Sequence, residues 1–159
     1  RHIAFVGGPL SVPQLANRLS GARNATRDTD GVQFEVIETD DHTVAAGMRA
    51  GEAILARPAA ERPDALQAGN DLLAIGLVQA LTASGGVRVP EDIAIIGYDD
   101  VPFAASAVVP LSTVRHPGPL IGRTALDLLL SELDEPNSTY RRHLVFLPEL
   151  VVRESTAGL

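Results

Sequence analysis

Apolar runs of strand length alternate with helix-like patterns along most of this 159-residue chain. A parallel sheet requires this order, because each helix carries the chain back to the start of the next strand. The sequence therefore predicts an α/β fold, with a mostly parallel sheet and helices on both faces. The expected strands cover residues 2–6, 32–37, 63–68, 93–96 and 111–116, the expected helices residues 12–27, 43–57, 70–84 and 120–133, and a last extended stretch residues 144–152.

The segment Val89–Asp100 combines a buried strand with two adjacent carboxylates. Its residues 93–96 are all apolar, which is typical of a central strand covered on both faces. Gly97 lets the backbone turn where this strand ends, so Asp99 and Asp100 emerge at the carboxyl edge, where open α/β sheets bind ligands. The pair could act as general acid and base, bind a metal, accept hydrogen bonds from a polar ligand, or cap a turn. No spacing of His, Asp and Glu supplies further ligands, so the sequence predicts no metal site.

Asn70 and Asp71 open the helix after the third expected strand. Asn and Asp are preferred N-caps, which is a sufficient structural reason for both residues. The same position also lies on the carboxyl edge of the sheet, beside the strand that carries Asp99. We expect the two roles to divide, with Asp71 in the helix start and Asn70 facing the cleft.

Three further polar residues have both a structural and a binding interpretation. Arg18 lies inside the first expected helix, where most arginines are solvated, but its forked guanidinium suits hydroxyls or a carboxylate if it turns inward. His42 precedes the second helix and is either a cap-region residue or a ring that stacks on a ligand. His116 ends the fifth expected strand and is either a loop residue or part of a cleft wall.

Charge and composition exclude several classes of function. The chain has 20 acidic and 13 basic residues and a net charge of −7, whereas nucleic-acid-binding domains usually carry a basic face. No apolar run reaches the roughly 18 residues that cross a bilayer. Cysteine and lysine are absent, which excludes thiol and Schiff-base nucleophiles, and no dinucleotide fingerprint, phosphate loop or nucleophile elbow is found. We expect neither enzyme activity nor a cofactor.

The last expected helix carries an apolar stripe without an evident partner. The stripe follows helical spacing and consists of Leu120, Ile121, Ala125, Leu128, Leu129 and Leu133. This helix is either one more outer helix of the same domain, or it packs against something that the chain does not contain.

Segments spread over nearly the whole chain resemble the lac repressor/galactose repressor (LacI/GalR) family of bacterial transcriptional regulators. They follow the order and spacing of that family, and they are Ile3–Pro9, Arg18–Gly21, Pro63–Ala65, Asn70–Gly76, Val89–Asp100, Pro110–Pro117 and Pro148–Thr156. Each segment alone is weak, but the set is specific. The resemblance implies a two-lobed, effector-binding core like that of type I periplasmic sugar-binding proteins, with the ligand held between the lobes.

The resemblance also implies which residues contact the effector. Arg18, Asn70 and Asp99 match the positions that bind it in the family. A ring at the position of His42 packs on the ligand, although an aromatic residue is common there and histidine is a departure. Gln14 and His116 align with secondary positions in the cleft.

The same resemblance divides the chain into parts. Residues 1–116 correspond to the C-terminal lobe, residues 117–142 to a crossover helix that packs in the absent N-terminal lobe, and residues 143–159 to a return strand and tail. The DNA-binding headpiece of the family is absent. The implied function is binding of a sugar or similar small polar effector by a cytoplasmic, homodimeric regulator that contacts operator DNA only through that headpiece and no membrane. The alternative is a periplasmic sugar-binding receptor of a transport system.

Overall fold

The computed structural model describes residues 1–27, 29–83, 85–134 and 143–157. A four-stranded sheet in the order β2-β1-β3-β4 lies at its centre, and each neighbouring pair of strands is parallel. The strands are β1 (His2–Val6), β2 (Gln33–Ile37), β3 (Ala65–Ala68) and β4 (Ala94–Ile96). The predicted parallel sheet is confirmed, and each of these strands begins within two residues of its expected start.

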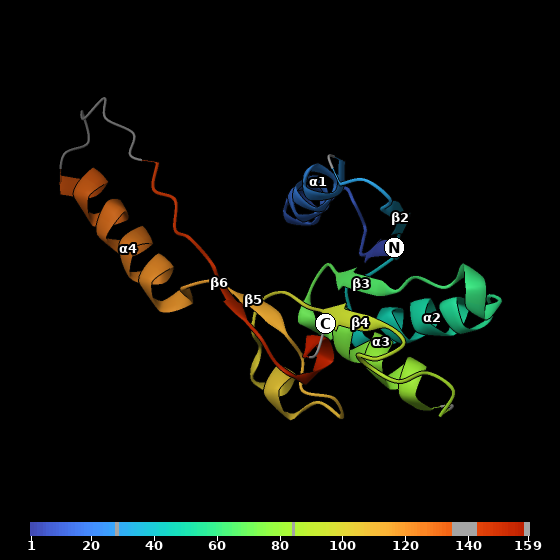
Figure 1. Ribbon diagram of the computed structural model, residues 1–159. Coiled ribbons are helices and arrows are strands. Elements are labelled where there is room, and N and C mark those ends of the chain that lie inside the picture. The colour runs from blue at the N-terminus through green and yellow to red at the C-terminus, as the bar shows by residue number, and fades with distance from the viewer. Residues whose placement is uncertain (28, 84, 135–142, 158–159) are drawn as a thin grey trace.

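Helices cover both faces of this sheet (Figure 1). On one face α1 (Pro13–Arg27) packs through Leu19 and Ala22 against Phe5. On the other face α2 (Val44–Leu55) and α3 (Asp71–Ala83) lie against each other. Because successive side chains of a strand point to opposite faces, the neighbours of Phe5 in β1 belong to the second and larger core, whose fully buried members include Val6, Ile54, Leu66, Leu73, Leu77 and Ile95.

The fifth expected strand does not join the parallel sheet as predicted. Only Ser112 forms a bridge, a parallel one to Ile96, the last residue of β4. The strand β5 (Thr113–Arg115) instead pairs antiparallel with β6 (Glu149–Val151) in a separate two-stranded sheet. Past the end of β4, the Gly97 N–H still donates to the Ser112 carbonyl at 2.8 Å and the Asp99 N–H to the Val114 carbonyl at 2.9 Å, while the returning chain supplies the regular strand partner of β5. Of the expected extended stretch 144–152, only β6 is a strand.

The last helix, α4 (Gly118–Asp134), stands apart from the sheet and is joined to it through β5 and β6 (Figure 1). It has no buried residue. Its exposed apolar side chains are Leu120, Ile121, Leu126, Leu129, Leu130 and Leu133. The predicted stripe therefore has no partner among the described residues. Ser84, the expected end of α3, and residues 135–142 of the expected crossover segment lie outside the described residues.

Short 3-10 helices complete the described structure: η1 (Ala59–Glu61), η2 (Pro102–Ser106) and η3 (Glu154–Thr156). In the part of the chain that the structure describes, no helix combines the length and apolarity needed to span a membrane.

Candidate functional site

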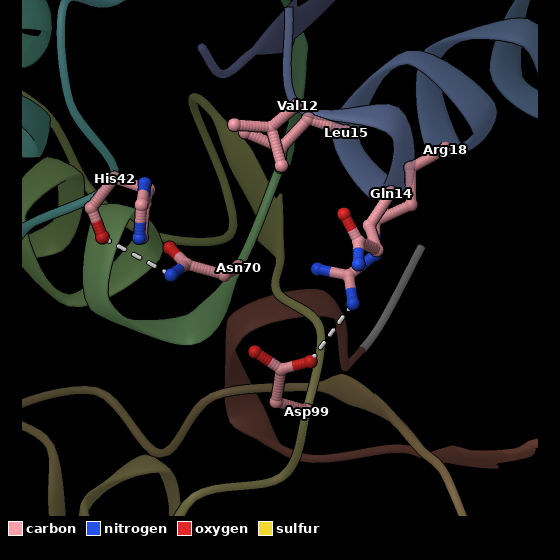
Figure 2. A pocket seen from close by; sticks show the side chains of 7 residues that line it. All are labelled: Val12, Gln14, Leu15, Arg18, His42, Asn70 and Asp99. Atoms are coloured by element: carbon pink, nitrogen blue, oxygen red, sulfur yellow. Dashed lines mark hydrogen bonds and ion pairs between the residues drawn. The ribbon is translucent and has the colours of Figure 1, made fainter. Parts of the chain in front are cut away.

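A pocket of about 160 Å³ opens at the carboxyl edge of the parallel sheet, near the start of α1, α2 and α3 (Figure 2). Five of the six predicted site residues line it, together with Val12 and Leu15: Gln14, Arg18, His42, Asn70 and Asp99. They are distant in sequence but meet here because the loops after parallel strands all lie at the same edge of a sheet.

Arg18 turns toward the pocket rather than toward solvent. It precedes the buried Leu19 on α1, so its side chain starts beside the helix face that packs on the sheet. Its Nη1 donates a hydrogen bond to the Gly69 carbonyl at 2.6 Å, and its Nη2 lies 3.0 Å from Asp99 Oδ1. The guanidinium carbon lies 3.7 Å from the centre of the Tyr98 ring, a cation–π contact. These contacts fix the fork while leaving further N–H groups for a ligand.

Asp99 and Asp100 have left-handed backbones, with φ angles of 109° and 54°. Such a conformation costs a residue other than glycine about 1–3 kcal/mol, so its surroundings must hold it. The Asp99 N–H donates to the Val114 carbonyl at 2.9 Å, and the Asp100 N–H donates to Thr113 Oγ1 at 3.3 Å. As a result the two neighbouring carboxylates have different partners, and Asp99 faces Arg18.

The Asp100 carboxylate binds arginines outside the pocket. It accepts hydrogen bonds from Arg115 Nε at 2.6 Å and from Arg153 Nη2 at 2.7 Å. Burial opposes the charge of Asp100, but the hydrogen bonds from Arg153 and Arg115 outweigh that effect and hold the pKa of its carboxyl below the ordinary 3.8. Asp100 is therefore held as an anion by the fold.

Asn70 has both roles that the sequence divided between Asn70 and Asp71. Asp71 is the first residue of α3 and Asn70 lines the pocket, as predicted, but the cap of α3 is Asn70, whose Oδ1 accepts the Leu73 N–H at 2.9 Å. Its Nδ2 donates to the His42 carbonyl at 3.0 Å (Figure 2). The cap and this bond hold the amide at the pocket wall, where one N–H remains for a ligand.

Asp71 is a buried linker that the sequence analysis missed. Its carboxylate accepts the Val101 N–H at 2.9 Å and the Thr113 hydroxyl at 2.6 Å, which joins α3 to the segment after β4 and to β5. Burial raises the pKa of Asp71, and these two hydrogen bonds partly oppose the rise. No local pattern reveals such a role, because both partners are far away along the chain.

Position 97 requires glycine because there is no room for a side chain, and not because the backbone adopts a positive φ angle. Its φ is not positive, and a Cβ at this position would collide with Asp71 Oδ1. The sequence interpretation of Gly97 as a residue that lets the backbone turn is therefore incomplete, since the close approach of a buried carboxylate is what excludes a side chain here.

The two histidines differ in their relation to the pocket. His42 lines it with a side chain that is 51% exposed, while the neighbouring Thr43 caps α2. His116 does not line the pocket, but its Nε2 lies 3.9 Å from Asp99 Oδ1 at the edge of the site. An exposed ring beside the pocket is able to pack on a bound ligand.

Together these groups suit a neutral, hydroxyl-rich molecule better than an ion. The Arg18–Asp99 pair places donors beside an acceptor while its charges compensate each other, and a hydroxyl group can accept from the first and donate to the second. Among the described residues, no group of three or more His, Cys, Asp or Glu side chains is placed to hold a metal ion.

Residues 1–156 match the family described as "Periplasmic binding protein-like domain". The chain is 34% identical over 159 residues to the HTH-type transcriptional repressor PurR of Aliivibrio fischeri, covering 99% of this chain and 46% of that protein. It is 36% identical over 158 residues to the ribose operon repressor of Escherichia coli, covering 96% of this chain and 46% of the repressor. The chain thus spans about half the length of the curated relatives it matches.

Solved structures of transcriptional regulators are also similar to this chain. The transcriptional regulator CelR in complex with cellobiose superposes with a TM-score of 0.84 at 35% identity, covering 96% of this chain and 46% of CelR. The lac repressor dimer bound to operator and the anti-inducer ONPF has a TM-score of 0.82 at 31% identity, covering 98% of this chain and 52% of that chain. The chain therefore belongs to the periplasmic binding protein-like domain family, and within it to the effector-binding domains of LacI-family regulators.

Proposed function

We propose that this pocket is one wall of a binding site for a small polar effector, a sugar or related polyol, in a transcriptional regulator. The observation that carries the proposal is the Arg18–Asp99 pair beside Asn70 at the carboxyl edge of the sheet. Arg18 and Asn70 supply donors and Asp99 an acceptor, and all three are held by bonds to the surrounding backbone. Because these side chains are already ordered, less conformational entropy is lost when a ligand binds.

A sugar fits this wall because each of its hydroxyls can accept a hydrogen bond from Arg18 or Asn70 and donate one to Asp99. A free carboxylate would face the Asp99 anion, and an amine would face the Arg18 cation, whereas a neutral polyol avoids both repulsions. The exposed His42 ring and the apolar Val12 and Leu15 offer surface for the C–H faces of a sugar ring. The names of relatives agree with this class, since one is a ribose operon repressor and another was solved with cellobiose.

The wall is only half of the proposed site. A pocket of about 160 Å³ is smaller than the roughly 300–1,000 Å³ typical of ligand sites. We infer that residues 1–116 form the C-terminal lobe, that a first lobe elsewhere in the whole protein supplies the opposite wall, and that α4 packs in that first lobe. The bare apolar face of α4 supports this arrangement, because large exposed apolar surfaces usually mark a contact.

In the whole protein, effector binding would shift the population of lobe arrangements and thereby the spacing of a DNA-binding headpiece. We propose a cytoplasmic homodimer that contacts operator DNA through that headpiece. The similarity to a repressor whose name specifies a helix-turn-helix type, and to a lac repressor dimer solved on operator, supports a regulator over a periplasmic receptor. The same relatives are regulators rather than enzymes.

The test is a binding experiment with two forms of the protein. A thermal-shift panel of D-ribose, cellobiose, sucrose, amino acids and nucleobases on the whole protein selects an effector, which is then titrated by calorimetry into the whole protein and into the 159-residue chain. We expect a sugar to be selected, and the chain alone to bind it weakly or not at all. Equal affinity of the two forms would contradict the half-site, and stabilisation only by an amino acid or nucleobase would contradict the sugar class.

A further inference from the structure

Besides the bond from Thr113 to Asp71, the carboxylate of Asp100 ties the segments around β5 and β6 to the pocket edge. Its two oxygens have different partners: Oδ2 accepts from Arg115 Nε, in β5, at 2.6 Å, and Oδ1 accepts from Arg153 Nη2, two residues after the end of β6, at 2.7 Å. The side chain of Asp100 is only 10% exposed and that of Arg153 only 17%. We refer to Asp100, Arg115 and Arg153 as the clamp.

The two arginines stand where the chain leaves the lobe and where it returns. Arg115 is the last residue of β5, shortly before α4, and Arg153 follows β6 on the way back. Arg115 also lies opposite Glu149 of β6, with Nη1 3.4 Å from its Oε2, so the clamp joins both strands. Because α4 has no buried residue, its described connection to the lobe is through these strands (Figure 1).

The clamp is also connected directly to the pocket through the backbone. Asp100 follows Asp99 directly, and both have left-handed backbones that are fixed by hydrogen bonds to β5 residues. A left-handed residue has little freedom to rotate without losing its conformation. The direction of the Asp99 carboxylate therefore depends on where β5 and the clamp hold the backbone of Asp100.

We propose that Asp100 is a positioning residue that sets the place of Asp99 against Arg18 and couples the pocket to the strands that lead to α4. The inference deepens the proposed function, on which it rests for the role of the pocket, by naming how the site is connected to the rest of the regulator. A shift of β5 and β6 relative to the lobe must either move Asp100 or break a largely buried, charge-assisted pair. Coupling of this kind is reciprocal, so a ligand on Asp99 also acts on the strands.

The first experiment needs no ligand and uses the 159-residue chain. NMR spectra of the arginine side chains report the Arg18 fork, because its bonds to Gly69 and Asp99 slow rotation and separate its Nη signals. We expect Asp100→Asn and Arg115→Gln to merge or broaden these signals. Arg88→Gln is the matched control, since it removes an exposed arginine that pairs with Asp92 away from the pocket.

The Arg115→Gln variant keeps the test decisive if Asp100→Asn fails to fold. The Arg115 side chain is 46% exposed, so its loss leaves the core intact, and an unchanged melting temperature with altered Arg18 signals separates positioning from general stability. Unchanged Arg18 signals in folded Arg115→Gln would overturn the proposal. Equal changes in Arg88→Gln would also overturn it.

The second experiment measures coupling in the whole protein with the sugar chosen by the thermal-shift panel. Hydrogen exchange should slow at β5 and β6 when the sugar binds, and this protection should fall in Arg115→Gln while protection at the start of α3 remains. The affinity for the sugar should fall roughly threefold to thirtyfold. Full protection of both strands in Arg115→Gln would contradict the coupling. If no sugar binds the wild-type protein, the proposed function fails, and the NMR experiment still decides the placement of Asp99.

Discussion

The lobe body, formed by the parallel sheet with α1, α2 and α3, and the helix α4 differ in how they are held. In the body, side chains such as Phe5, Leu66 and Leu77 are completely buried. In α4, Leu129 and Leu133 are 55% and 67% exposed, and no residue of the helix is buried. An amphipathic helix is stabilised mainly by the surface its apolar face packs on. The body supplies its own packing surfaces, whereas no described residue of α4 is buried, and we propose that another part of the whole protein or another chain supplies the missing surface.

The largest expected effect is a contrast between equivalent leucine truncations in the two regions. Leu77→Ala in α3 removes a fully buried side chain and should lower the free energy of unfolding by about 3 kcal/mol. Leu129→Ala in α4, the matched control, should change it by no more than about 0.5 kcal/mol, because the side chain is already exposed. Urea denaturation of the 159-residue chain, at a concentration low enough to keep it monomeric, measures both, and a similar loss in the two variants would show that α4 is packed within the monomer.

A middle-sized effect should appear where the two regions join, at Asp100. Asp100→Asn should cost about 1–3 kcal/mol near neutral pH, because a charge-assisted pair with Arg153 is lost in a largely buried place. The pKa of Asp100 is lowered in the folded state, so its contribution is present above its ordinary pKa and lost as the pH falls through the folded value.

The lowered pKa of Asp100 also predicts how its contribution to stability depends on pH. The difference in unfolding free energy between wild type and Asp100→Asn should be constant above about pH 5 and should shrink below about pH 4. Asp71 has the opposite sign, since its raised pKa makes protonation favour the folded state, but it is present in both proteins and cancels in the difference. A difference that stays constant down to about pH 3 would contradict the lowered pKa.

The smallest effect on stability is expected from the apolar face of α4 itself. Leu126→Glu with Leu133→Glu changes two exposed positions on this face, so the free energy of unfolding should change by no more than about 0.5 kcal/mol each. Association should change instead, since we expect this face to pair between chains at high protein concentration when its own partner is absent. Light scattering should show a smaller mass for the double variant. A wild-type protein that stays monomeric at high concentration, with α4 ordered and exposed, would contradict this expectation.

How far the sequence predicts this structure depends on whether the determining contact is local. The strands of the parallel sheet, the three helices of the body and α4 follow from periodicity and from caps such as Thr43. The placement of Asn70 and Asp99 at one edge follows from the parallel order of the strands. These predictions need no knowledge of distant contacts.

Other features depend on partners far along the chain. The inward direction of Arg18 is set by Gly69 and Asp99, and the pairing of β5 with β6 is set by a segment that returns after α4. The burial of Asp71 beside Gly97 likewise cannot be read from either residue alone. The assignment of Arg18, Asn70 and Asp99 to the effector rests on the family resemblance and remains a prediction.

The most direct test of the half-site is calorimetry of the whole protein with the sugar chosen by the thermal-shift panel, comparing Asp99→Asn with Asp127→Asn. Both variants replace a carboxylate by its amide, but Asp127 lies exposed on α4, away from the pocket. Asp99→Asn removes the negative charge that orders Arg18 and replaces one acceptor oxygen by a donor, so it should weaken binding by at least about tenfold, while Asp127→Asn should bind like wild type. Wild-type affinity in folded Asp99→Asn would contradict the assignment of this pocket to the effector.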